Sequence, residues 1–183
     1  MTKNNRKNSH KTMNWLRRGM FVGTLALLGG GTALAADPPV TADVLTKLHE
    51  SDLKEIEAGK LAQKNGQSPQ VRDYGRMLVK DHTAADKKVA SLAKEENVPL
   101  TDSAPASRAR PDPMSGMTKD STFDETFVRD MIDDHKKDIA AVTEARDNTT
   151  DDKLKKLLTD LLPTLQKHEE AAQKIADTAA ARR

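Results

Sequence analysis

The spacing of apolar residues constrains this chain more than any other feature. Over residues 69–97 and 151–180 apolar side chains recur at alternating steps of three and four, and residues 41–64 and 122–146 follow the same rule. Because an α-helix completes a turn in 3.6 residues, this spacing places the apolar side chains on one face of a helix. The pattern predicts four amphipathic helices around one core and no strand.

Residues that break helices stand between these stretches. NGQSP at 65–69 separates the first two helices, DNTTDD at 147–152 separates the last two, and Thr41 is expected to cap the first. Such short connections predict two antiparallel hairpins. The segment 98–120 is rich in Pro, Ser and Gly, and when extended it could span about 75 Å, more than the ~42 Å of a helix of about 28 residues.

The expected fold is therefore all-α: a ferritin-like four-helix bundle, with two antiparallel hairpins joined by a long crossover at 98–120. A crossover of this kind makes the second and third helices parallel. An up-down-up-down bundle with a long loop is the alternative.

The first 35 residues have the pattern of a secretory signal peptide. Six basic residues and no acidic one precede an apolar run from Met20 to Leu28, and the small residues Ala-Leu-Ala end at Ala35. The apolar run is about half the ~20 residues that a membrane-spanning helix needs. We expect cleavage after Ala35 or Ala36, no stable membrane span afterwards, and one domain, 36–183, that is periplasmic or secreted.

Removal of this leader changes the sign of the net charge. The whole chain has 30 basic and 28 acidic residues, and taking away the six basic residues of the leader leaves 24 against 28, a net charge of −4. A mildly acidic protein without a basic block gives no reason to expect nucleic-acid binding. No glycine-rich phosphate loop, nucleophile elbow or Cys/His zinc pattern is present, so the sequence identifies no catalytic residue.

Three of the four histidines beyond the leader interrupt the apolar stripes. They are His82, His135 and His168, one near the middle of each of the last three helices. On the first helix the corresponding stripe carries two acids, Asp52 and Glu55. If the second and third helices are parallel, His82 and His135 lie at one level of the core.

Two interpretations of these polar residues are open. Imidazole is the commonest metal ligand, and helical bundles build metal sites from facing helices. One transition-metal ion (Zn, Cu, Fe, Mn or Ni) would then be held by Glu55, His82, His135 and His168. In the alternative, the protein is a structural or stress-related envelope protein whose core histidines are satisfied by neighbouring acids, as buried polar groups usually are. The fourth histidine, His49, is expected at the surface or the edge of the core.

Four motifs in this order, EIEAGKLA, MLVKDH, FDETFVRDMIDDH and LLPTLQKHEEAA, follow the leader. Together they resemble an exported bacterial family catalogued as domain of unknown function 4142, over about residues 42–176. The resemblance implies a ferritin-like bundle, a periplasmic location and no established activity. Its recurrent polar residues match Glu55, His82, His135 and His168. The Glu-x-x-His pairs of di-iron ferritins are absent, since an apolar residue stands three positions before each of these histidines.

Overall fold

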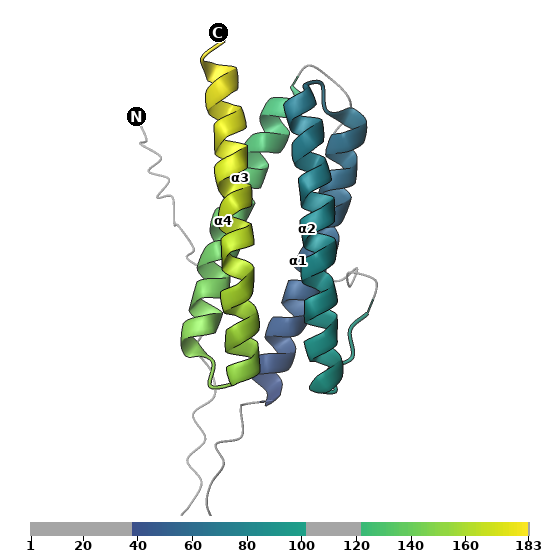
Figure 1. Ribbon diagram of the computed structural model, residues 1–183, viewed down its shortest axis with the longest axis vertical. Helices are drawn as coiled ribbons and strands as arrows, with labels where there is room; N and C mark the ends of the chain where they lie inside the picture. Colours follow the sequence, from purple (N-terminus) through teal and green to yellow (C-terminus); the bar gives the residue numbers. More distant parts are fainter. Residues whose placement is uncertain (1–37, 102–121, 183) are drawn as a thin grey trace, which may run out of the picture. The chain divides into compact units, whose positions relative to one another are not determined.

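The computed structural model describes residues 38–101 and 122–182. These ranges contain four helices: α1 Pro38–Asn65, α2 Pro69–Glu95, α3 Phe123–Asn148 and α4 Asp152–Ala180 (Figure 1). Neither range contains a strand, so the predicted all-α four-helix bundle is confirmed. The predicted signal peptide, 1–35, and most of the predicted linker, 98–120, lie outside the described residues, and the domain bounds stay predictions.

Helices α2 and α4 begin where a side chain satisfies free backbone N–H groups of the first turn. The Ser68 hydroxyl accepts the N–H of Val71 at 3.2 Å at the start of α2, and the Asp151 carboxylate accepts two N–H groups at the start of α4. The predicted cap at Thr41 is wrong, because α1 begins earlier, at Pro38. Thr41 instead lies buried in α1 and donates its hydroxyl proton to Asp151 Oδ2 at 3.2 Å.

Contacts between helix ends define the topology. At one end of the bundle, the Asp124 carboxylate in the first turn of α3 accepts the N–H groups of Gln67 and Ser68, each at 2.7 Å, just before α2. At the other end, Thr41 of α1 bonds to Asp151, the cap of α4. Helices α2 and α3 consequently run parallel to each other and antiparallel to α1 and α4 (Figure 1). This is the ferritin-like arrangement predicted from the sequence.

The core consists of two apolar clusters with a polar layer between them. The inward face predicted for α2 is buried, His82 included. One cluster includes Leu45, Val89, Val142, Leu158 and Leu161. The other includes Val71, Leu78, Phe127, Met131 and Ala172. Between the clusters, near the middle of each helix, lie five buried polar residues: Asp52, Glu55, His82, His135 and His168. The clusters supply the hydrophobic stabilisation and cover the polar layer from both ends of the bundle.

No helix in the two described ranges combines the length and the apolar character needed to cross a membrane.

Helices α1 and α2 approach each other closely at two glycines. A Cβ atom on Gly75 would lie 2.6 Å from the Gly59 carbonyl oxygen and 2.8 Å from Ala62 Cβ. A Cβ atom on Gly59 would lie 2.7 Å from the Gly75 carbonyl oxygen. These distances are shorter than van der Waals contact, so the glycines permit the helix spacing that brings Asp52 beside His82.

We predict that Gly75→Ala lowers the free energy of unfolding by about 1–3 kcal/mol, the usual cost of overpacking a core. The loss should occur although Ala favours a helix by ~1 kcal/mol over Gly. Urea denaturation followed by circular dichroism measures it. Ser91→Ala, at an exposed position of α2, is the control and should change stability by less than about 0.5 kcal/mol. A Gly75→Ala protein as stable as the wild type would contradict the close contact.

Candidate metal centre

The three histidines that the sequence placed on inward faces meet in the polar layer. One ring nitrogen from each of His82, His135 and His168 lies within 4.8 Å of the others. The ring centroids are 5.1–5.8 Å apart, and each residue is at most 3% exposed. We refer to these residues as the histidine triad. His82 and His135 lie at one level, as the parallel helices require.

Each triad histidine has a second ring nitrogen that bonds outside the triad. The bonds join His82 Nδ1 to Asp52 Oδ1 at 2.8 Å, His135 Nδ1 to the Met131 carbonyl oxygen at 3.0 Å, and His168 Nε2 to Asp81 Oδ2 at 3.1 Å. A carbonyl oxygen can only accept a hydrogen bond. The neutral ring of His135 therefore carries its proton on Nδ1 and a lone pair on Nε2.

Asp81 determines the protonation of His168 in the same way. Its Oδ2 atom accepts hydrogen bonds from His168 Nε2 and from Lys167 Nζ, the latter at 3.0 Å. Burial raises the pKa of Asp81, but the hydrogen bonds and charges of His168 and Lys167 outweigh it and lower the pKa overall. An ionised carboxylate has no proton to donate. The neutral ring of His168 therefore carries its proton on Nε2 and a lone pair on Nδ1.

The inner nitrogens of two triad histidines face each other without a proton between them. His135 Nε2 and His168 Nδ1 are 3.3 Å apart, and both carry lone pairs. Burial lowers the pKa of both rings to about 4, so neither gains a second proton at neutral pH. The third inner nitrogen, His82 Nε2, is buried without a hydrogen-bond partner. An unpaired buried polar group costs about 1–3 kcal/mol, and a bound cation would satisfy all three nitrogens at once.

Two carboxyl groups of α1, Asp52 and Glu55, are buried in the same polar layer. Asp52 Oδ2 and Glu55 Oε2 are buried without hydrogen-bond partners. Burial, together with the neighbouring acids, raises the pKa of each group to about 8. When Asp52 keeps its proton it donates to His82 Nδ1, and His82 then carries its own proton on Nε2. A cation favours ionised carboxylates, so its arrival would release a proton from the Asp52–His82 pair and free the His82 lone pair.

Glu55 is placed differently from the three histidines. In the described ranges, the group of mutually close ligand atoms consists of the triad and does not include the Glu55 carboxylate. Glu55 is nevertheless 6% exposed, and its unpartnered oxygen belongs to the same polar layer. Its acidic neighbours Asp138 and Asp134 add to the increase in its pKa.

His49 differs from the prediction that placed it at the surface or the edge of the core. It is 4% exposed, because α2 and the segment that follows α2 cover it. Its Nδ1 atom bonds to Asp86 Oδ1 at 2.5 Å and its Nε2 atom to the Thr101 carbonyl oxygen at 3.2 Å. His49 is thus a buried histidine with both ring nitrogens partnered, in contrast to the triad.

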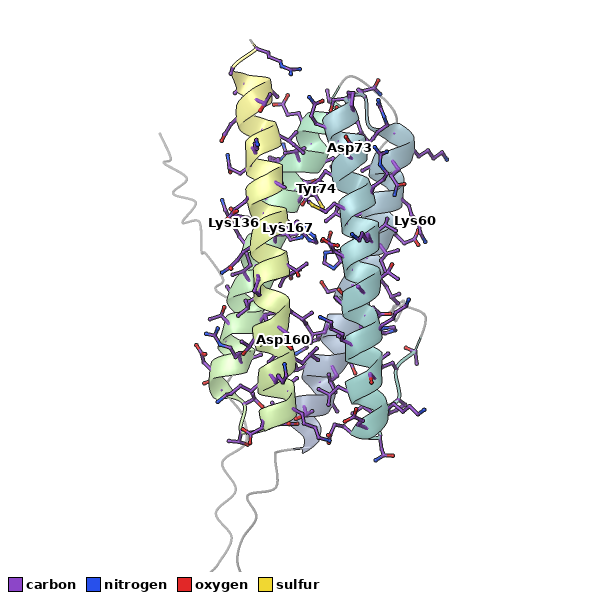
Figure 2. The ribbon with its side chains drawn as sticks, viewed as in Figure 1. Lys60, Asp73, Tyr74, Lys136, Asp160 and Lys167 are labelled. Atoms are coloured by element: carbon purple, nitrogen blue, oxygen red, sulfur yellow. The ribbon has the colours of Figure 1, made fainter. Side chains whose placement is uncertain are left out.

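Tyr74 also borders the triad, and sequence reasoning did not select it. The side chain extends from α2 into the space between the two hairpins (Figure 2) and is 3% exposed. Its ring makes an edge contact with His168, with centroids 6.5 Å apart, and its hydroxyl is buried without a partner. Burial, followed by the charge of Glu55, raises the pKa of Tyr74, so the phenol stays protonated. The only sequence feature that could have pointed to Tyr74 is its position next to Gly75, a residue on the buried face of α2.

We predict that the metal-free protein loses stability between about pH 6.5 and 8. Unfolded Asp and Glu ionise near pH 4, whereas folded Asp52 and Glu55 keep their protons until the pH reaches about 8. The unfolded state therefore binds fewer protons in this window, and stability falls by about 1.4 kcal/mol per pH unit for each such group. The histidines oppose this trend only in the lower part of this window, because unfolded histidine loses its proton around pH 6.5.

Glu55→Gln should reduce this loss by about half, because it removes one of the two titrating groups. Urea unfolding at pH 6.5 and pH 8 in the presence of a chelator measures it. The matched control is Glu57→Gln, two residues further along α1, where the side chain is 71% exposed. Equal pH dependence in the wild type and both variants would show that Glu55 does not hold its proton.

Comparisons with known proteins agree with this architecture. Two solved structures are similar to this chain: CopM in the Cu(I)-bound form, with 17% sequence identity and a TM-score of 0.58, and CopM in the Cu(II)-bound form, with 16% and 0.57. The alignments cover 77% and 78% of this chain, respectively, and 96% of each CopM chain. At this level of identity the likeness concerns the fold alone.

A search of curated protein sequences found no match. Residues 30–175 match the family described as domain of unknown function (DUF4142). The match includes all four histidines of the described helices and agrees with the resemblance noted from the sequence motifs. Because it extends over most of the sequence, this chain belongs to the DUF4142 family.

Proposed function

We propose that this protein is an exported helical bundle that binds one transition-metal ion, copper, at the histidine triad. The main support is the pair of facing nitrogens, His135 Nε2 and His168 Nδ1, which lie 3.3 Å apart with both protons held elsewhere. Two buried lone pairs repel each other at this distance. A cation between them and His82 Nε2 replaces that repulsion with three coordinate bonds.

The donor set and the fold neighbours favour copper. Neutral imidazole suits Cu, Zn, Ni and Fe, whereas Mn prefers carboxylate and water. The two structurally similar CopM structures are in Cu(I)-bound and Cu(II)-bound forms. Copper is therefore our first choice, with Zn, Fe, Mn and Ni as the competing ions in a binding experiment.

Glu55 is proposed as the fourth ligand. Its Oε2 atom is buried without a partner, and burial keeps the carboxyl protonated until a positive charge arrives. Together with Asp52 and Asp81, an ionised Glu55 would supply the negative charge that a divalent ion needs in a buried site. Rotation of the Glu55 side chain toward the triad would complete a set of three nitrogens and one oxygen.

Export is inferred from the predicted signal peptide, residues 1–35. A basic segment, an apolar run and a small-residue cleavage site are the signals of secretion. We propose a periplasmic or secreted location on this ground.

The second candidate is a structural or stress-related envelope protein in which the triad fixes only the helix register. One observation favours it: each triad histidine already has one hydrogen bond outside the triad. Buried polar groups can fix the register of a bundle in this way. This hypothesis requires no metal and makes the histidines a source of stability.

Metal analysis of the purified protein separates the two functions. We expect the wild type to take up about one copper ion per chain, and its melting temperature to rise with added copper because only the folded state binds it. His135→Ala should abolish both effects. His49→Ala is the control, since His49 is a buried histidine outside the triad, and its copper content per folded chain should match the wild type. Negligible copper in all three proteins would leave the structural function standing.

The stability of His135→Leu in the absence of metal gives a second test. His135 forms one hydrogen bond, to a carbonyl within its own helix, and its other nitrogen faces a lone pair. Leucine of similar size should therefore leave the free energy of unfolding unchanged or increase it, while copper binding is lost. If the triad is structural, the substitution should instead cost about 1–3 kcal/mol. Urea denaturation with a chelator present decides between the two.

A further inference from the structure

Asp81 connects the buried triad to the surface of the bundle. It precedes His82 on α2, but its carboxylate contacts α4, where Oδ2 accepts hydrogen bonds from His168 Nε2 at 3.1 Å and from Lys167 Nζ at 3.0 Å. The Asp81 side chain is 18% exposed, whereas that of His168 is fully buried. Asp81 is therefore the polar contact between the triad and the solvent-facing side of α2 and α4.

The triad presents two kinds of nitrogen to its centre. His135 is held through Nδ1 and turns Nε2 inward, whereas His168 is held through Nε2 and turns Nδ1 inward. A neutral imidazole has a single N–H proton, and the partner of one nitrogen decides which nitrogen carries it. The carboxylate of Asp81 therefore keeps the proton of His168 on the outer nitrogen.

Without Asp81, two histidines of the triad could form a hydrogen bond with each other. If the proton of His168 moved to Nδ1, it would point at the lone pair of His135 Nε2, which lies 3.3 Å away. An ordinary imidazole–imidazole hydrogen bond would form, and both inner lone pairs would be lost to a metal ion. The bond to Asp81 opposes this arrangement.

We propose that Asp81 is a positioning residue that keeps His168 in the Nε2–H tautomer and so keeps the triad open to a metal ion. This role depends on the proposed copper binding. A carboxylate that orients a ligand histidine typically contributes about 10- to 100-fold to metal affinity. Lys167, which is 60% exposed, bonds to the same oxygen and holds the Asp81 carboxylate in place.

The other Asp-His pair of the sequence does not share this role. Asp134 precedes His135, but its carboxylate bonds to Lys137 at 2.9 Å, and its side chain is 38% exposed. The proton of His135 is held by the Met131 carbonyl instead. The assignment thus comes from the contact between α2 and α4 and not from the Asp-His order in the sequence.

Long-range ¹H–¹⁵N NMR spectra of the metal-free protein at pH 7 test the inference, because they report which ring nitrogen carries the proton. We expect Nε2–H for His168 in the wild type and a shift toward Nδ1–H in Asp81→Ala. Asp81→Asn should retain Nε2–H, since the amide oxygen still accepts. Asp86→Ala is the matched control: it removes the carboxylate partner of His49 on the same helix and should leave His168 unchanged.

Copper affinity supplies the second readout. With Cu(I) delivered in competition with a chelator, Asp81→Ala should bind about 10- to 100-fold more weakly than the wild type. Asp81→Asn should lose less than Asp81→Ala, and Asp86→Ala should match the wild type. Circular dichroism confirms that each variant is folded.

Two results would overturn the positioning role. One is a His168 tautomer that is the same in the wild type and Asp81→Ala, and the other is an altered tautomer with unchanged copper affinity. If the tautomers behave as expected but the wild type binds no copper, the proposed function fails and the role of Asp81 fails with it. The tautomer readout distinguishes that case, because it needs no metal.

Discussion

Two imidazole nitrogens that both lack a proton face each other at 3.3 Å inside this bundle, and a third imidazole nitrogen is buried beside them without a partner. The surrounding structure maintains this arrangement. The Met131 carbonyl and the Asp81 carboxylate hold the protons on the outer nitrogens, and burial keeps the rings neutral. The helices cannot move apart to relieve the unfavourable contact, because apolar clusters on both sides of the layer hold them together.

The polar layer lowers the stability of the bundle at the centre of the core, where apolar side chains ordinarily increase it. Leucine or isoleucine at the triad positions would add apolar burial, as the neighbouring positions of the same stripes do. The two acids of α1 add a further cost, since burial raises the pKa of Asp52 and Glu55 to about 8. Residues that reduce stability at a structurally central position are typical of binding sites. A bound cation would turn each of these unfavourable groups into a favourable one.

Much of the fold and part of the site could be predicted from the sequence. Helical periodicity identified the four helices and the inward positions of the triad, because the face on which a residue lies depends only on its own helix. The role of Asp81 and the burial of His49 could not be predicted, because each depends on contacts with other parts of the chain. Asp81 acts on a histidine of α4, and His49 is covered by α2 and the segment after it. Such partners depend on the register between helices, which is set by contacts such as that of Asp124 with the α1–α2 turn.

X-ray absorption spectroscopy of the copper-loaded wild-type protein tests the central claim most directly, because the fine structure reports the ligands of the metal itself. We predict a first shell dominated by nitrogen at roughly 2.0 Å, a distance typical of metal–imidazole bonds. The outer-shell scattering should fit three imidazole rings, and His135→Ala should hold no copper that could give such a spectrum. A first shell of oxygen or sulfur without imidazole scattering, or copper retained by His135→Ala with the same spectrum, would contradict a metal centre at the histidine triad.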